Sequence, residues 1–446
     1  MNSYRASDVG LRAEAKTFAI ICIKDNGDIW QRFINECRGY PGEETSMKAG
    51  RIVTLLLVLA LLLTLGGCGA PEKKDSADSA ASSAAGSQVV VHTDPYTDVT
   101  GKKVGISMPA QTDQIAVRQC KVMEDMFRRR GCEVTTVYAD GTAGQQATDL
   151  GGLIGSGCDL LLIRAVDGSA LTKVLKKAHA KDIPVIACGQ LITGNDAVSY
   201  YVAEDSYRIG TMEGQYLIDT LGMKLDVNSK EYHVEFAAGD PNDYKARYRF
   251  NGTYDVLKPY IDAGILIIGS GQSTFSAVAT PGYDSAAAEE RLKQITNQYY
   301  TDGKILDGII CGNDTIAEGA AKAVESGYNG KNHVLIIGQG GDLKGLSAVL
   351  NRKASMTTYI PCEDEATVAA ALGLVLLSGD PGDGNLIRDN AWDFSCTFDT
   401  SSYDNGTGIL PAYLLTPVVI TESSLKAELI DKGHFTLDGN TLQETA

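Results

Sequence analysis

The chain has 446 residues, with 40 Lys and Arg against 56 Asp and Glu, and a formal net charge of −16 at pH 7. This acidic balance excludes nucleic acid as a partner, because neutralising phosphates requires a concentrated basic face. The 10 cysteines and 5 histidines form neither a CxxC pair nor a histidine cluster, so the sequence predicts no metal site, no cofactor and no disulfide framework. Buried free thiols are expected, and an isolated disulfide stays open.

An apolar run near the N-terminus precedes a cysteine. Residues 52–65 (IVTLLLVLALLLTL) carry no charge, follow Lys48 and Arg51, and fall short of the roughly 20 residues that span a bilayer. A basic front, a short apolar core and small residues behind it are typical of a secretory signal. The LGGC at 65–68 resembles the lipobox of bacterial lipoproteins, which implies cleavage before Cys68 and lipidation of its sulfur. A plain signal anchor is the alternative.

The position of this signal predicts where translation starts and what the neighbouring segments are. Translation is expected to start at Met47, which makes 47–67 the lipoprotein signal peptide and 1–46 a non-native upstream extension. Residues 68–88 are the lipidated cysteine and a flexible linker with almost no large apolar side chain to bury. Such an N-terminus implies a cell-envelope protein outside the cytoplasm, held at the membrane by its lipid.

After the linker, short strands alternate with helices. The first expected strands, each rich in Leu or β-branched residues, are 104–108, 134–138, 160–163, 183–187 and 199–202. Apolar residues with helical spacing follow the first strand, and they are Ala116, Cys120, Met123 and Phe127. Gly131 ends this helix. Short apolar strands separated by helices favour right-handed crossovers and a parallel sheet covered on both faces.

The same alternation repeats in the second half of the chain. Its expected strands are 234–237, 265–268, 308–311, 334–337 and 356–359. Its expected helices include 244–257, 286–298, 316–325 and 365–377. Two such sets predict an α/β fold with two doubly wound lobes of similar architecture. Ligands bind beyond the carboxyl ends of the strands in open α/β sheets, so two facing lobes would make a cleft.

Several stretches resemble one family of proteins. They are KVGISMPAQ (103–111), VSYYVAEDSYRIG (198–210), VLKPYIDAGILIIGSGQ (256–272), GIICGNDTIAEGAAKAV (308–324), LIIGQGGD (335–342) and LPAYLLTPVVIT (410–421). Through them the chain is similar to type I periplasmic binding proteins, and among these to the xylose- and ribose-type sugar receptors of ABC importers. The resemblance implies two Rossmann-like lobes with parallel sheets, joined by a three-stranded hinge, that close on a ligand without catalysis.

This resemblance also implies how the chain is divided between the lobes. The N-terminal lobe is expected to comprise 89–204 plus 361–380, and the C-terminal lobe 205–360 plus about 410–446. Residues 381–409 are left unassigned.

The ligand positions of the family are carried over residue by residue. Gln111 and Thr112 stand in the loop after the first strand, and Asp205 matches the acidic hinge residue. The string ARYRFNG (246–252) resembles a ribose-type motif and gives Arg247 the ligand-facing role. The N-D turn gives Asn313 a hydrogen-bonding role.

Three of the family's positions are altered in this chain. Where the family has an Asp-Arg pair after the fourth strand, this chain has Gly189-Gln190. After the ninth strand, the segment from Gln339 to Asp342 stands where the family has an Asp. Tyr359 occupies the last hinge position, where a Gln often contacts the ligand.

A sugar presents paired hydroxyls and a partly apolar ring face. Planar bidentate groups recognise the hydroxyls and aromatic rings recognise the face. The bidentate groups expected here are Gln111, Gln190, Asp205, Arg247 and Asn313, and the aromatic surface is expected from Tyr244, Tyr248 or Tyr359. Lys245 and Arg249 beside Arg247 allow an anionic ligand, but the favoured interpretation is one binding Arg with its neighbours solvated or paired to acids such as Asp243.

The expected function is capture of a monosaccharide or sugar derivative by lobe closure and its delivery to an ABC permease. No nucleophile, base and acid constellation predicts an enzyme. The lost Asp-Arg pair keeps nucleosides, inositols and other polyols open as ligands. A sensor that presents its closed state to a membrane histidine kinase is the alternative function, since both roles use exposed lobe surfaces.

Overall fold

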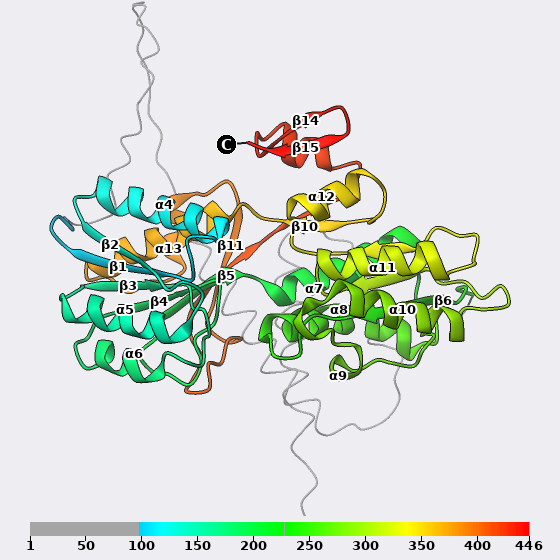
Figure 1. Ribbon diagram of the computed structural model, residues 1–446, viewed down its shortest axis with the longest axis horizontal. Helices are drawn as coiled ribbons and strands as arrows, with labels where there is room; N and C mark the ends of the chain where they lie inside the picture. The colour runs from blue at the N-terminus through cyan, green and yellow to red at the C-terminus, as the bar shows by residue number, and fades with distance from the viewer. Residues whose placement is uncertain (1–97, 227, 446) are drawn as a thin grey trace, which may run out of the picture. The chain divides into compact units, whose positions relative to one another are not determined.

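The first of two lobes is built on parallel strands. The computed structural model describes residues 98–226 and 228–445 (Figure 1). The elements of the first lobe begin with β1 (Lys103–Met108), α4 (Gln114–Arg129), β2 (Glu133–Tyr138), α5 (Ala143–Gly155), β3 (Leu160–Ile163), α6 (Thr172–His179), β4 (Val185–Cys188) and β5 (Tyr200–Glu204). Every expected strand of this set is present, with its ends shifted by at most two residues.

Two late strands complete the first sheet. Its order is β11-β12-β5-β4-β3-β1-β2. Strand β12 (Ala412–Thr416) runs parallel to β5, and β11 (Ser395–Asp399) runs antiparallel to β12. This pairing corrects the expected lobe boundary at about residue 410, because Ala412 pairs with Tyr201 in the first lobe. The unassigned segment 381–409 contains α14 (Asn385–Asn390) and β11, the latter in the same sheet.

The second lobe has a smaller parallel sheet in the order β7-β6-β8-β9. Its elements are α7 (Ser206–Leu221), β6 (Tyr232–Ala237), α8 (Tyr244–Asp262), β7 (Leu266–Ile268), α9 (Phe275–Val278), η1 (Pro281–Tyr283), α10 (Ser285–Tyr299), β8 (Gly308–Cys311), α11 (Asp314–Gly327), β9 (Leu335–Ile337), α12 (Leu343–Leu350) and β10 (Thr357–Tyr359). The expected fifth strand, β10, joins this sheet only by a bridge between Met356 and Ile337.

The chain passes between the lobes three times. It leaves the first lobe from β5 into α7, returns from β10 into α13 (Cys362–Leu377), and leaves again from β12 into β13 (Val418–Ile420). Strands β10 and β13 pair antiparallel at the crossings. The expected α/β fold of two doubly wound lobes joined by three crossings is thus confirmed.

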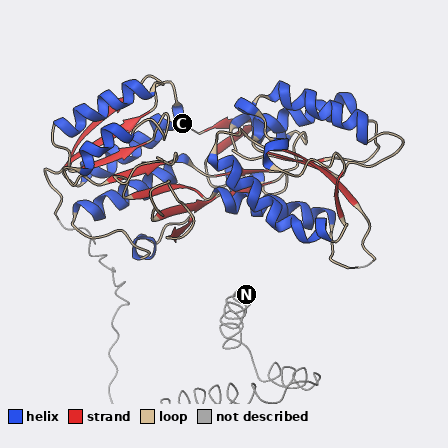
Figure 2. Cartoon of the chain, turned by 90° about the horizontal axis from the view of Figure 1, so that it is seen from below, coloured by secondary structure: helices blue, strands red, loops and turns tan. Residues whose placement is uncertain are grey.

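Apolar residues cover both faces of each sheet. Every residue of β3 and β4 is buried, as expected for parallel strands with helices on both sides (Figure 2). Helix α4 begins after Asp113, whose side chain accepts a hydrogen bond from the Ala116 amide, and it buries its regularly spaced apolar residues against β1 and α13. These cores hold the strand ends, and the loops that follow them, in fixed positions.

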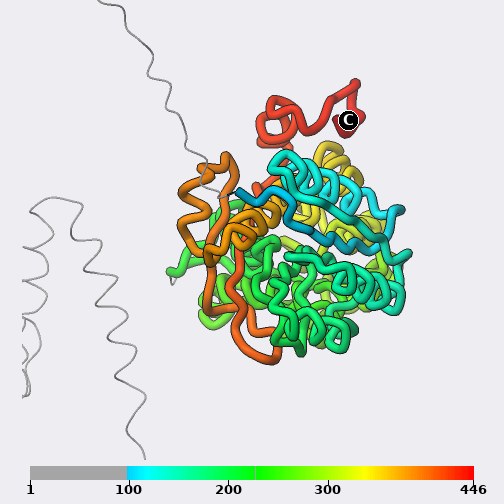
Figure 3. The backbone as a smooth tube through the Cα atoms, turned by 90° about the vertical axis from the view of Figure 1, so that its left-hand side faces the viewer, coloured from blue at the N-terminus to red at the C-terminus, as the bar shows by residue number. Residues whose placement is uncertain are grey.

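A short C-terminal module follows β13. It contains η2 (Lys426–Ile430) and the hairpin β14 (Phe435–Asp438) and β15 (Thr441–Glu444), which stands out at the top of Figure 3. Leu429, Phe435 and Leu442 pack with Leu346 and Val349 of α12 in one apolar cluster. The module therefore belongs to the second lobe.

The described cysteines are free thiols. They are Cys120, Cys132, Cys158, Cys188, Cys311, Cys362 and Cys396, of which the first five are buried. Within residues 98–226 and 228–445, no helix is both long and apolar enough to cross a membrane. The expected upstream extension, signal peptide and linker with Cys68 lie outside the described residues.

Candidate ligand-binding cleft

A polar cavity lies between the end of β5 and the loops that follow the strands of the second sheet. Its volume is about 270 Å³. Its lining residues include Glu204, Lys245, Arg249, Asn313, Gln339 and Asp342. Glu204 ends β5 of the first lobe, whereas the other residues follow β6, β8 and β9 of the second. The cavity therefore lies at the carboxyl ends of the strands, where open α/β sheets bind ligands.

Three charged side chains meet across the two lobes in this cavity. Oε1 of Glu204 lies 3.7 Å from Nζ of Lys245 and 4.0 Å from Nη2 of Arg249. Burial raises the pKa of Glu204, but the charges of Lys245 and Arg249, with Arg164, outweigh it and leave the pKa below its ordinary value. Glu204 is therefore a half-buried carboxylate that stays ionised beside two cations.

The structure places Arg247 outside the lining of this cavity. Lys245 and Arg249 are four residues apart on α8 and share a face, so Arg247 between them points elsewhere. It is exposed, and its guanidinium carbon lies 5.2 Å from the centroid of the Phe275 ring. Arg249 is only 5% exposed, and its Nη1 donates to the carbonyl oxygen of Gly312. Lys245 and Arg249, which were expected to be solvated or paired to acids such as Asp243, face Glu204 and line the cavity.

The starts of α11 and α12 bring three expected site residues together. Asn313 caps α11, accepting a hydrogen bond from the Ile316 amide at 2.9 Å. Asp342 caps α12 in the same way through the Gly345 amide, at 2.7 Å. Gln339 is 7% exposed, and like Asn313 and Asp342 it lines the cavity.

Asp314, next to Asn313, ties these two helix starts together. Its carboxylate accepts hydrogen bonds from the Thr357 hydroxyl at 2.8 Å and from the Gly341 amide at 2.8 Å. Burial raises the pKa of Asp314 to about 6, although these hydrogen bonds oppose the shift. The loop from Gln339 to Asp342 is thereby fixed against the start of α11.

The first lobe supplies an ion pair that the sequence analysis missed. Arg164 directly follows β3, and Glu365 lies in the first turn of α13. Nη1 of Arg164 donates to Oε1 of Gln119 at 2.9 Å, and Nε2 of Gln119 donates to Oε1 of Glu365 at 3.2 Å. Burial raises the pKa of Glu365, and the charge of Arg164 opposes this. The strand-end rule applied to β3 would have found Arg164, but no local signal places Glu365 beside it.

Three further expected residues lie around the first lobe's strand ends. Gln111 and Thr112 are exposed in the turn between β1 and α4. Gln190 is half-buried after β4, and its backbone N–H donates to the carbonyl oxygen of Cys188 at 2.7 Å. None of the three lines the polar cavity of the described chain.

Tyr244, Asp205 and Tyr359 also lie away from the cavity lining. The Tyr244 hydroxyl hydrogen-bonds Tyr201 and accepts from the Leu191 amide at 3.0 Å, so it joins the two lobes. Asp205 caps α7, accepting from the Arg208 amide at 2.9 Å. The Tyr359 ring packs against the C-terminal module, with its centroid 5.7 Å from that of Phe435.

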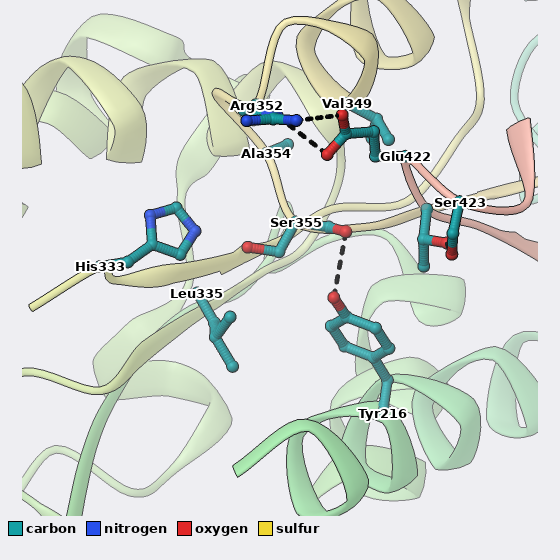
Figure 4. A pocket seen from close by; sticks show the side chains of 10 residues that line it. Tyr216, His333, Leu335, Val349, Arg352, Ala354, Ser355, Glu422 and Ser423 are labelled. Atoms are coloured by element: carbon teal, nitrogen blue, oxygen red, sulfur yellow. Dashed lines mark hydrogen bonds and ion pairs between the residues drawn. The ribbon is translucent and has the colours of Figure 1, made fainter.

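A larger hollow of about 500 Å³ lies within the second lobe, outside the cleft (Figure 4). Several of its polar groups are paired: Nη2 of Arg352 lies 2.6 Å from Oε1 of Glu422, and the Tyr216 hydroxyl donates to the Ser355 carbonyl oxygen at 3.1 Å. It contains none of the expected site residues. A ligand there would contact one lobe only.

The cavity between the lobes suits the binding of a polar ligand. Its lining holds four acidic side chains, two cations and two side-chain amides within one small volume, and these groups donate to and accept from hydroxyls. Among the described residues, no group of three or more His, Cys, Asp or Glu side chains is placed to hold a metal ion.

Known proteins share this architecture. Residues 104–381 match the family described as periplasmic binding protein domain. The multiple sugar-binding periplasmic protein SbpA of Azospirillum brasilense is 29% identical, covering 77% of this chain and 92% of its own. The multiple sugar-binding periplasmic receptor ChvE of Rhizobium radiobacter is 28% identical, covering 75% and 91%.

A solved structure is also similar over most of the chain. It is an ABC transporter solute binding protein from Clostridium phytofermentans with bound β-D-glucose, which is 35% identical with a TM-score of 0.63. The match covers 75% of this chain and 98% of that protein. With its two lobes, its three crossings and these relatives, the chain belongs to the periplasmic binding protein family.

Proposed function

We propose that the protein is an extracytoplasmic receptor that captures a monosaccharide or sugar derivative and delivers it to an ABC permease. The observation that carries this proposal is the polar cavity, in which Glu204 of the first lobe meets Lys245 and Arg249 of the second. Charged groups that bond two neighbouring hydroxyls at once give a sugar both affinity and a fixed orientation. The names of the relatives support the same class of ligand.

Closure of the lobes would convert binding into a signal for the permease. A ligand that bonds groups of both lobes stabilises the arrangement in which they lie close together. Closure also excludes water, which strengthens the polar contacts inside. The closed form is then the state that delivers its ligand. This cycle needs no catalytic step, in keeping with a family of binding proteins.

The ligand is expected to be neutral or to carry few charges. The cations Lys245 and Arg249 already face Glu204, so their charges are partly balanced before a ligand binds. A strongly anionic sugar would compete with this carboxylate and is disfavoured. A polyol or nucleoside, which also presents neighbouring hydroxyls, is the alternative ligand.

Members of this family act outside the cytoplasm, and we propose that lipidation of Cys68 keeps this one at the membrane. The LGGC sequence and the apolar run before it support this. Expression in a bacterial host with an alkyne-tagged fatty acid would label the wild type in the membrane fraction. Cys68→Ser should lose the label and appear in the soluble fraction, and an equally labelled Cys68→Ser variant would refute lipidation.

Calorimetric titration against a panel of ligands tests the receptor function. The panel would hold pentoses, hexoses, sugar acids, inositols, nucleosides and polyols. The proposal expects saturable one-to-one binding of at least one neutral monosaccharide, with sugar acids weaker than their neutral counterparts. Binding of a nucleoside or polyol alone would favour the alternative ligand, and absence of binding across the panel would refute the proposal.

A further inference from the structure

A second crevice lies at the hinge, between the starts of α7 and α8 of the second lobe and β11 of the first. This hinge crevice has a volume of about 340 Å³ and shares no lining residue with the cavity that holds Lys245 and Arg249. Its acidic and aromatic lining residues are Asp205, Tyr207, Tyr248, Phe398, Asp399 and Tyr403. It is therefore a separate space that both lobes build.

The hinge crevice carries negative charge. Asp205 and Asp399 line it, and none of its lining residues, all within the described ranges, is basic. Burial raises the pKa of Asp399, but hydrogen bonds from the amides of Ser401 and Ser402, at 3.0 and 2.7 Å, outweigh this and lower it. Asp399 therefore stays ionised.

Asp205, the second carboxylate of the crevice, has a raised pKa, unlike Asp399. Burial raises the pKa of Asp205, and the charge of Asp399 adds to this, while the Arg208 amide and charge oppose it. The Arg208 guanidinium itself contacts the Thr211 hydroxyl at 3.5 Å. A cation in the crevice would thus lie near two carboxylates. It would displace no basic side chain, because none lines the crevice.

Tyr403 presents a buried hydroxyl to this charge. The residue is 2% exposed, and its hydroxyl oxygen has no hydrogen-bond partner among the described residues. Burial raises the pKa of Tyr403, and the charge of Asp205, which lines the same crevice, adds to this. Buried polar atoms without a partner are rare in folded proteins, so this hydroxyl marks a place for a polar ligand atom.

Aromatic rings form the walls around this hydroxyl. The Tyr403 ring stacks on Tyr248 with centroids 5.2 Å apart and planes at 9°, and its centroid is also 5.2 Å from that of Tyr201. Tyr207 is 41% exposed at the rim, and Phe398 lines the first-lobe side. Aromatic faces beside carboxylates attract organic cations through their ring quadrupoles.

We propose that the hinge crevice binds a small organic amine in its protonated form, whose ammonium group donates to the Tyr403 hydroxyl and the Asp205 carboxylate while its alkyl part packs against the rings. An ammonium group has three donors and no acceptor, which matches a site that offers two acceptors and aromatic faces. Because Asp205 and Tyr248 belong to the second lobe and Tyr403 to the first, a bound amine contacts both lobes. Its affinity is therefore coupled to that of the ligand in the main cleft.

Calorimetric titration with putrescine tests this proposal, and butane-1,4-diol serves as the uncharged probe of the same length. The full chain should bind putrescine and not the diol. Tyr403→Phe keeps the stacked ring and removes only the hydroxyl, and it should weaken putrescine binding about fivefold. Asp205→Asn keeps the cap of α7 and removes the charge, and it should weaken binding at least about tenfold.

Controls separate this site from general attraction to an acidic protein. Glu318→Gln removes an exposed acid of α11, far from the crevice in sequence and outside its lining, and should leave putrescine affinity unchanged. Tyr403→Phe should retain the sugar affinity of the wild type, which shows that the variant is folded. Absence of putrescine binding up to about 10 mM, or equal losses in Glu318→Gln and the crevice variants, would overturn the proposal. A wild type that binds putrescine but no sugar would refute the receptor function alone.

Discussion

Nη1 of Arg164 lies 3.9 Å from Oε1 of Glu365, and both atoms occupy the space that a side chain at Gly189 would need. A Cβ at Gly189 would lie 2.9 Å from each of them, and the residue has a φ of +67°. The family that the chain resembles has an adjacent Asp-Arg pair after the fourth strand, where this chain has Gly189-Gln190. In this chain Arg164, after β3, and Glu365, in α13, place a guanidinium and a carboxylate beside Gly189 instead.

Arg164→Met should weaken sugar binding by about tenfold or more. The change roughly keeps the length of the side chain but leaves the largely buried Glu365 without its cation, which disfavours the ionised carboxylate. Calorimetric titration with the best sugar measures the effect. The double variant Arg164→Met/Glu365→Gln removes both charges and should recover part of the stability lost in the single variant. Wild-type affinity in Arg164→Met would exclude the pair from the site.

Lys245→Ala and Arg247→Ala form a matched pair on one helix. Lys245 lines the cleft beside Glu204, whereas Arg247 lies over Phe275 on the outside. Loss of a charge-assisted hydrogen bond should weaken sugar binding at least about tenfold in Lys245→Ala, and Arg247→Ala should change it less than about twofold. The reverse order of losses would restore Arg247 as the ligand-facing residue.

Tyr244→Phe tests the contact between the lobes. Its hydroxyl bonds Tyr201 and the Leu191 amide of the first lobe, so the variant should destabilise the closed form by about 1 kcal/mol and weaken sugar binding roughly fivefold. Tyr216→Phe removes a hydroxyl that bonds Ser355 within the second lobe and serves as the control. Small-angle scattering would follow closure in parallel. Equal sugar affinity in both variants and the wild type would show that the Tyr244 contact does not favour closure.

Glu213 should make stability depend on pH. It is 1% exposed, and burial raises its pKa to about 8, although Arg249 and Thr253 oppose the shift. A carboxyl whose folded pKa is raised contributes stability in full below the unfolded pKa of 4.5, and this contribution is lost as the pH rises through about 8.

Urea unfolding at pH 5 and pH 8 measures this dependence. Between these values the wild type should lose more than about 2 kcal/mol of unfolding free energy relative to Glu213→Gln, which cannot titrate. Glu318→Gln, an exposed control, should keep the wild-type profile. Parallel pH profiles for the wild type and Glu213→Gln would mean that Glu213 does not bind a proton more tightly in the folded state.

The strands and most helices could be predicted from the sequence, because the apolar spacing that marks each element lies within that element. The last strands of the first sheet did not, since β12 pairs with β5 from more than 200 residues away and β11 pairs antiparallel at the edge. Hydrophobic runs reveal that a strand exists but not which lobe completes its sheet. The expected start of the C-terminal segment at about residue 410 was wrong for this reason.

The candidate site was predicted in part. Asn313, Gln339 and Asp342 follow strand ends and line the cavity, and the position of a strand end can be predicted from the sequence. The motif does not fix which face of α8 turns inward, and in the structure Arg249, not Arg247, lines the cavity. Glu204 was missed because it precedes the hinge Asp205 by one residue, and at a strand end neighbouring residues face opposite ways.

A crystal structure of the protein with the sugar that binds most tightly tests the central claim most directly. The account predicts one sugar between the lobes, with hydroxyls within hydrogen-bond distance of Glu204, of Lys245 or Arg249, and of Asn313. A sugar bound outside this cavity, in the hinge crevice or in the second-lobe hollow beside Arg352, with the residues at Glu204 untouched, would contradict it.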